Sequence, residues 1–130
     1  MRIAVAIVAV VVIAWLGVMY RDAHLQARGV AVLRDRSADR DLRGAEADLL
    51  AARFLNPDAA PDTTRAVIYR AQGRDRDAIA LLDEIVRREP DNLSAWSVMR
   101  LSATGTDTAA FKRSLAQLQR LDPVNVPRGR

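Results

Sequence analysis

The sequence predicts an all-α protein in which an N-terminal transmembrane helix is followed by antiparallel helix hairpins, two to three repeats of an α-solenoid fragment. Two observations support this fold class: an uncharged apolar stretch at the N-terminus, and a pattern of prolines and apolar residues that recurs along the rest of the chain. With 130 residues, the chain has room for one modest helical domain beside a membrane segment. We expect a membrane anchor over residues 1–21, a helical repeat domain over 22–124 and a disordered tail over 125–130.

The first expected element is apolar on every side. No charged residue lies between Arg2 and Arg21. As an α-helix, residues 3–20 would be about 27 Å long, close to the roughly 30 Å thickness of the hydrocarbon core of a bilayer. Trp15 and Tyr20 lie toward the second end, where aromatic rings favour the membrane interface. Residues 3–20 are therefore expected to contact the lipid bilayer as a single-pass anchor.

Two alternatives remain for this stretch. A cleaved secretory signal has an apolar core of about 7 to 15 residues followed by a small-x-small cleavage site. The apolar core here is longer, and residues 18–22 contain no convincing site of that kind. A buried core helix of a soluble protein is the other alternative, which the lack of a polar face disfavours.

The orientation of the anchor follows from the arginines that flank it. Four arginines follow the apolar stretch closely, and one precedes it: Arg21, Arg28, Arg34 and Arg36 against Arg2. Cytoplasmic flanks carry the excess of Lys and Arg, so the charge asymmetry leans toward a cytoplasmic location for the C-terminal domain. The alternative is that the short N-terminal tail stays in the cytoplasm, which would place the domain on the opposite side of the membrane.

The repeat is marked by three prolines. Pro57, Pro90 and Pro123 are evenly spaced, since 90 − 57 = 33 and 123 − 90 = 33. Three apolar columns precede the prolines in register, at the twelfth, eighth and fifth positions before each: Ala45, Ala78 and Phe111; Leu49, Leu82 and Leu115; Ala52, Ile85 and Leu118. These offsets lie on one face of an α-helix. Each unit is therefore expected to end in a helix that buries an apolar stripe and stops before its proline.

The middle unit predicts both helices of a hairpin. Gly73 separates an expected helix over 63–72 from a second over 75–88. Two aspartates at the start of the second helix lie where a helix N-terminus favours carboxylates, and Asn92 is expected to cap the helix that follows. The opening helix of the first unit would come from residues 23–36, which can continue directly from the membrane helix.

This arrangement resembles the tetratricopeptide repeat, whose period is about 34 residues. The residues of the middle unit that match the family pattern are Tyr69, Gly73, Ala78, Leu82, Ile85 and Pro90. Asp62 and Arg65 stand where the family prefers Trp and Leu, and Ser102 stands at the tyrosine position of the last unit, so the first helices depart from the pattern. The resemblance covers roughly residues 26–124. An unrelated helical bundle with coincidental prolines is the alternative.

The resemblance implies a concave, protein-binding groove lined by the first helix of each hairpin. The groove positions of the family, carried over residue by residue, are Thr63, Val67, Arg70, Trp96 and Arg100. Trp96 and Arg100 share a helix face, and both residue types are enriched in binding hot spots. We expect a partner protein that presents an acidic or C-terminal peptide. The alternative is that Trp96 packs into the core between repeats.

The chain offers little for catalysis. It contains one histidine, His24, and no cysteine, and it lacks the spacings of metalloprotease, serine-hydrolase and phosphate-binding motifs. We therefore expect no enzyme activity, no metal and no cofactor. The formal net charge is +4, with 16 acidic residues interleaved among 20 basic ones, which disfavours nucleic-acid binding.

The function expected from these observations is a membrane-anchored protein-interaction module, an adaptor or assembly factor of a membrane-associated complex. Two alternatives remain. A cleaved signal would release an exported soluble helical-repeat domain. Unfinished repeat ends expose apolar surface, so a structural subunit that self-associates as a homo-oligomer is the second alternative.

Overall fold

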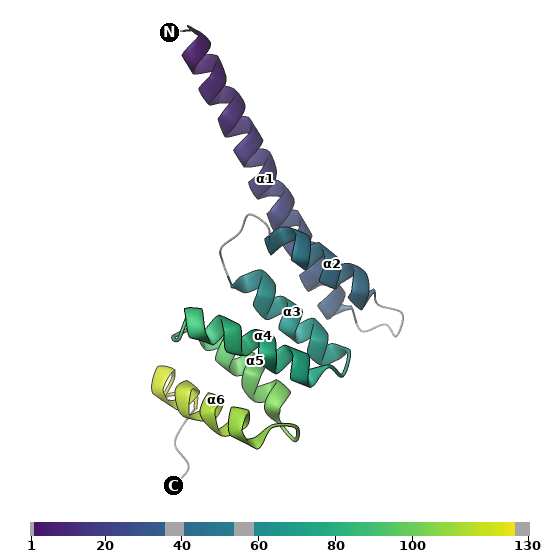
Figure 1. The fold of residues 1–130 in the computed structure, drawn as a ribbon, viewed down its shortest axis with the longest axis vertical. Helices are drawn as coiled ribbons and strands as arrows, with labels where there is room; N and C mark the ends of the chain where they lie inside the picture. The colour runs from purple at the N-terminus through teal and green to yellow at the C-terminus, as the bar shows by residue number, and fades with distance from the viewer. Residues whose placement is uncertain (1, 36–40, 54–58, 127–130) are drawn as a thin grey trace. The chain divides into compact units, whose positions relative to one another are not determined.

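The computed structural model describes residues 2–35, 41–53 and 59–126 (Figure 1). These residues form an all-α structure with six helices and no strand, which confirms the expected fold class at this level. The helices are α1 (Arg2–Arg34), α2 (Leu42–Arg53), α3 (Ala60–Ala71), α4 (Asp75–Arg88), α5 (Leu93–Ala103) and α6 (Thr108–Leu121). The chain divides into two compact units, Met1–Asp58 with α1 and α2, and Ala59–Arg130 with α3 to α6.

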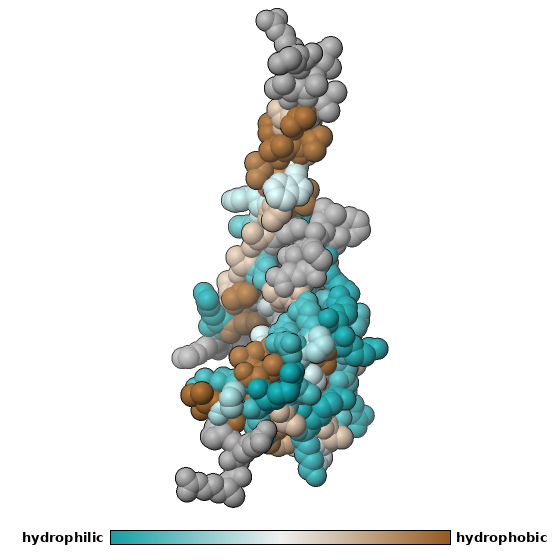
Figure 2. Space-filling view, turned by 90° about the vertical axis from the view of Figure 1, so that its left-hand side faces the viewer, coloured by the Kyte–Doolittle hydropathy of each residue, from teal (hydrophilic) through white to brown (hydrophobic). Residues whose placement is uncertain are grey.

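Helix α1 is one unbroken helix of 33 residues. Its side chains are almost all exposed over residues 8–20, including Ile13 at 69% and Tyr20 at 75%, and Figure 2 shows hydrophobic surface on this part of the helix. Among the described helices, α1 is long and apolar enough over Val8–Arg34 to cross a membrane, with a mean hydropathy of 1.5. A signal sequence close to an N-terminus meets the same criteria of length and composition.

The second half of α1 packs against α2 within the first unit. Gly29 is buried at this contact, and a Cβ atom added to it would lie 2.9 Å from Cγ of Leu49. The absence of a side chain at residue 29 therefore lets α2 approach α1 closely. Arg28 and Asp48 form an ion pair beside it, with 3.5 Å between Nε and Oδ2. The segment expected to open the first unit thus continues directly from the apolar stretch.

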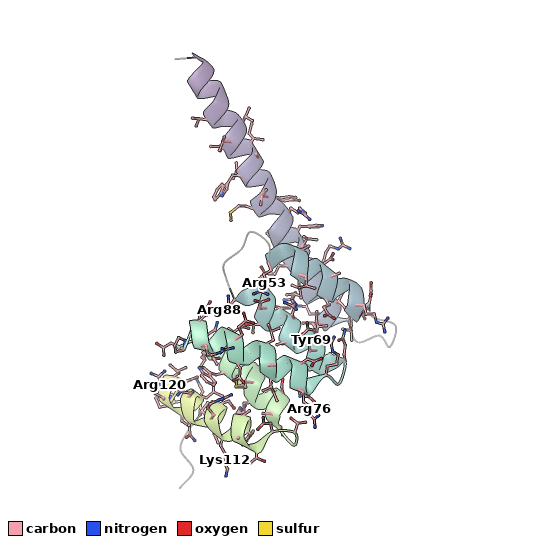
Figure 3. All side chains as sticks on the ribbon, viewed as in Figure 1. Arg53, Tyr69, Arg76, Arg88, Lys112 and Arg120 are labelled. Carbon is pink, nitrogen blue, oxygen red and sulfur yellow. The ribbon has the colours of Figure 1, made fainter. Side chains whose placement is uncertain are left out.

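Helices α3 to α6 pack in sequence, α3 on α4, α4 on α5 and α5 on α6, and α3 also packs on α5. Figure 1 shows that α4 and α6 run in one direction and α3 and α5 in the other. The labelled side chains of Figure 3 agree, because Arg88 and Arg120 lie at one end of α4 and α6 and Arg76 and Lys112 toward the other. The buried residues of the main core are Ala59, Ala66, Tyr69, Ala78, Leu82, Ile85, Val86, Ala95, Trp96, Met99 and Leu118.

Local signals in the sequence define the turns of this unit. Gly73 has a φ of +74°, which glycine tolerates and other residues rarely adopt. It lies in the turn between α3 and α4, as expected. Helix α4 has Asp75 and Asp77 in its first turn and stops just before Pro90. The Oδ1 atom of Asn92 accepts a hydrogen bond from the main-chain nitrogen of Ala95 at 3.0 Å, which confirms the expected cap of α5.

Helix α3 begins earlier than the sequence predicted, at Ala60 rather than at residue 63. Pro61 lies in its first turn, where the missing N–H of proline removes no helical hydrogen bond and its fixed φ suits the helix. The proline therefore starts the helix here. The boundary expected between residues 21 and 22 falls inside α1, and residues 127–130 of the expected tail lie outside the described residues, as does Pro57.

The apolar columns of the repeat are buried in α2 and α4, and the two helices differ from α6 in this respect. All six column residues of α2 and α4 are at most 3% exposed. In α6, Leu118 is buried, whereas Phe111 and Leu115 are half-buried. Helix α5 follows α4 and packs on it, but no helix follows α6 among the described residues. The end of the helix series therefore leaves part of the α6 stripe open.

The difference between α4 and α6 predicts unequal effects of one substitution. Leu82→Ala should lower the free energy of unfolding by about 3 kcal/mol, because it removes a fully buried side chain and leaves a cavity. Leu115→Ala removes the same atoms from a half-buried position and should cost about 1 kcal/mol. Denaturant unfolding of the full-length protein in detergent, followed by circular dichroism, measures both. Equal losses would contradict the difference in burial.

Candidate functional site

An open hollow of about 400 Å³ lies among α4, α5 and α6. We call it the Trp96 hollow, and its lining residues are Asp83, Val86, Arg87, Trp96 and Arg113. Helix α4 contributes three of them at i, i+3 and i+4, a spacing that places them on one face. Helix α5 contributes the tryptophan and α6 contributes Arg113, so the site depends on the packing of three helices.

Trp96 forms a fixed apolar wall of the Trp96 hollow. The residue is 5% exposed and belongs to the main core, together with Val86. Its Nε1 atom donates a hydrogen bond of 2.7 Å to the main-chain oxygen of Pro90, in the turn before α5. The indole is therefore held at both its polar and its apolar ends, and this wall of the hollow is preorganised.

The charged groups of the Trp96 hollow are unequally paired. Arg113 forms an ion pair with Asp83, and its Nη2 atom also lies 3.8 Å from Sδ of Met99. Arg87 donates from Nε to the main-chain oxygen of Asp83 at 3.2 Å. Its guanidinium has no carboxylate partner within the part of the chain that the structure describes. The hollow therefore carries one guanidinium in excess over its carboxylate.

The residues expected in the groove lie at different depths. Thr63 is buried and its hydroxyl donates to the main-chain oxygen of Ala59 at 2.9 Å, whereas Val67 is half-buried and Arg70 is exposed. On α5, Arg100 is half-buried, and its buried Nε atom has no hydrogen-bond partner among the residues that the structure describes. The two sets lie on neighbouring helices, because α3 packs on α5.

The position of Trp96 agrees with the core alternative, and it also adjoins a hollow other than the expected groove. It packs in the core and it also lines a hollow, but this hollow is built with α4 and α6 rather than with α3. Sequence reasoning missed Val86, Arg87 and Arg113. The spacing of the α4 residues was available as a signal, but the neighbour that this face meets depends on tertiary packing.

Asp62 and Arg65, which depart from the family pattern, pair with each other. Arg65 donates from Nη1 to Oδ1 of Asp62 at 2.9 Å and from Nη2 to the hydroxyl of Tyr69 at 2.8 Å. Arg88 adds an ion pair to Asp62 at 3.5 Å, and the guanidinium of Arg74 lies 4.2 Å from the centroid of the Tyr69 ring. Asp62 and Arg65 are therefore already paired with each other, which favours a structural role for them over a ligand-binding one.

A second hollow, of about 490 Å³, lies between the α3–α4 and α5–α6 turns. Its charged residues are balanced, two arginines and two aspartates: Arg74, Arg76, Asp75 and Asp77. Arg74 is already engaged, since its Nε atom donates to Asp77 at 2.8 Å. This hollow therefore has no charge excess to select a ligand.

No group of three or more potential metal ligands occurs among the described residues. The ring of His24 is stacked on that of Tyr20, with 6.2 Å between centroids. Comparisons with protein-family models, with curated proteins and with solved structures find no match for the chain. The tetratricopeptide resemblance therefore stays a prediction from the sequence pattern.

The anchoring of Trp96 can be tested with a conservative substitution. Trp96→Phe should lower the free energy of unfolding by about 1 to 2 kcal/mol, because it loses the hydrogen bond to Pro90 and some buried area. Trp15→Phe is the matched control. Trp15 is 60% exposed, so this change should stay within about 0.5 kcal/mol of wild type. Denaturant unfolding in detergent measures both variants, and equal stabilities would show that Trp96 is not held as described.

Proposed function

We propose that the chain is a membrane-anchored protein-interaction module, an adaptor or assembly factor of a membrane-associated complex, without catalytic activity. The observation that carries this proposal is the exposed apolar surface of α1, which continues without a break into a packed helix hairpin. One helix then serves two environments, with its first part in lipid and its second part in water.

The energetics of α1 favour a membrane over water. A contiguous apolar surface of this kind is unfavourable in water and marks a membrane or protein contact. Each Ile, Val or Leu near the bilayer centre favours insertion by about 0.3 to 0.6 kcal/mol, and residues 8–20 are rich in them. The arginines that follow, beginning at Arg21, suit a cytoplasmic flank. We therefore assign the packed helices to the cytoplasmic side.

The continuity of α1 supports the role of an adaptor. Residues 21–34 extend the helix by about 21 Å beyond the apolar stretch, at 1.5 Å per residue. The α1–α2 hairpin therefore stays near the bilayer without a flexible linker. Tethering raises the effective concentration of a binding surface, so a weak interaction is sufficient for assembly at the membrane.

We infer that α3 to α6 are two hairpins of the tetratricopeptide kind. The alternating helix directions, the packing of α3 on α5 and the buried column before Pro90 support this inference. The paired Asp62 and Arg65 replace the apolar residues of the family, and Ser102 is buried at the tyrosine position. Stacked hairpins commonly present protein-binding surfaces, which agrees with an interaction module.

Arginine substitutions in α1 test the anchor. Val11→Arg with Val12→Arg should move most of the protein from the carbonate-resistant membrane fraction to the soluble fraction, because each charge costs about 2.5 to 3.5 kcal/mol at the centre of a membrane helix. The matched control is Ala80→Arg with Ala116→Arg, two exposed positions of α4 and α6, which should remain in the membrane.

The intact mass of the wild-type protein separates the anchor from a cleaved signal. Retention of the full 14.3 kDa chain in the carbonate-washed membrane supports the anchor. A soluble, shortened chain would identify an exported domain. A soluble chain of full mass would show that α1 is buried against a partner in water, and the anchor would be wrong.

A second candidate function is self-association through α6. The observation that favours it is the half-burial of Phe111 and Leu115, whose equivalents Ala78 and Leu82 are fully buried beneath the next helix. A second copy of the chain that packs on this stripe would continue the helix stack and form a homo-oligomer.

Polar substitutions on α6 test self-association. Phe111→Gln with Leu115→Gln should convert a dimer into a monomer, as measured by light scattering of the full-length protein in detergent, because the apolar contact is lost. Val124→Gln is the control, since Val124 is 86% exposed and lies beyond the α6 helix. A wild-type protein that is monomeric at high concentration would rule this candidate out.

A further inference from the structure

We propose that the Trp96 hollow is the partner-binding site and that it takes an acidic peptide segment, with an apolar side chain against Trp96 and Val86 and a carboxylate on Arg87. This inference rests on the proposed function of a protein-interaction module and names the surface and the chemistry of the partner. It places the site with the second helices of the hairpins, α4 and α6, and not with the first helices.

The size and walls of the Trp96 hollow suit one side chain and the peptide around it. Its volume of about 400 Å³ falls within the range of small binding pockets, about 300 to 1,000 Å³. Val86 and Trp96 are both less than 9% exposed and belong to the core, so these apolar walls do not have to be ordered when a ligand binds. A preorganised wall lowers the entropic cost of binding.

Charge selects the class of ligand. Arg113 and Asp83 neutralise each other, whereas the guanidinium of Arg87 lacks a carboxylate partner among the described residues. A guanidinium offers planar donors that match a carboxylate, and such charge-assisted bonds are stronger than neutral ones. Arg113 is 51% exposed in its side chain and keeps donors beyond its bond to Asp83. The Trp96 hollow therefore attracts an acidic peptide segment and repels a basic one.

The first-helix positions offer a weaker combination. Thr63 is buried and bonded within its own helix, so its hydroxyl is occupied. Arg70 is exposed on α3, and it does not line the Trp96 hollow. Arg70 and Arg87 thus differ in one respect that matters: only Arg87 adjoins the tryptophan wall. They form a matched pair of exposed arginines for an experiment.

The experiment uses the full-length protein in nanodiscs of phosphatidylcholine. A phage-displayed library of random peptides is selected on these nanodiscs, and the most enriched peptide is synthesised with a fluorescent label. Its affinity is measured by anisotropy for wild type, Arg87→Gln and Arg70→Gln, together with a version of the peptide in which Asp and Glu are replaced by Asn and Gln. Circular dichroism verifies that both variants keep their helix content.

We expect enriched peptides to carry acidic residues beside an apolar one. Arg87→Gln should weaken binding about tenfold, as loss of a charge-assisted hydrogen bond predicts, and Arg70→Gln should leave it unchanged. The amide version of the peptide should lose the same factor on wild type. Higher salt should weaken wild-type binding more than binding by Arg87→Gln.

Five results would overturn the inference. Peptides without acidic excess, or equal binding by Arg87→Gln and wild type, would remove the role of the guanidinium. Weaker peptide binding by Arg70→Gln, with binding by Arg87→Gln unchanged, would place the site on the first helices of the hairpins, while the interaction function stands. A shift of Arg87→Gln from dimer to monomer would show that a second copy fills the hollow. No enrichment of peptides above empty nanodiscs would exclude peptide binding at the Trp96 hollow. The membrane anchor is tested separately, by membrane fractionation and intact mass.

Discussion

The constraint on which this structure depends is that α1 exposes apolar side chains that the described residues do not bury. Val8 and Ile13 are more than 60% exposed, although both favour an apolar environment. The same helix is buried at Gly29, where α2 packs on it. A single helix therefore joins an exposed apolar surface to a surface packed against α2. In the proposed anchor, a lipid bilayer covers the first surface and protein packing covers the second.

The elements that local chemistry determines could be predicted from the sequence. Gly73 adopts a positive φ and ends a turn, and Asn92 caps the next helix, because each depends on its immediate neighbours in the chain. The apolar columns before Pro90 are buried for a similar reason, since a stripe on one face of a helix has to meet another element. The start of α3 lies earlier than expected, because Pro61 lies in the first turn of the helix.

The candidate site could not be predicted in the same way. Trp96 was identified from its residue type, but the residues that form a hollow with it come from α4 and α6, the helices before and after α5. Arg87 and Arg113 look like ordinary surface arginines until the helices are packed. Thr63 shows the opposite error, because a position on the expected groove face is buried and bonded to its own helix. The exposure of a residue and the residues it contacts depend on tertiary packing, and the spacing of residues along the sequence predicts neither of them.

Two kinds of arginine occur in the second unit, and they differ in whether the guanidinium is paired with a carboxylate. Arg65 is buried and bonds to Asp62 through Nη1 and to Tyr69 through Nη2, while its Nε atom has no hydrogen-bond partner among the described residues. Removal of Asp62 would therefore leave a buried charge. A buried pair of this kind contributes little net stability, because desolvation of both charges offsets their attraction. Arg87 is exposed beside a preorganised apolar wall and keeps its guanidinium without a carboxylate in the described part of the chain. The guanidinium of Arg65 is therefore engaged inside the unit, whereas that of Arg87 is the one to which we assign the carboxylate of a partner.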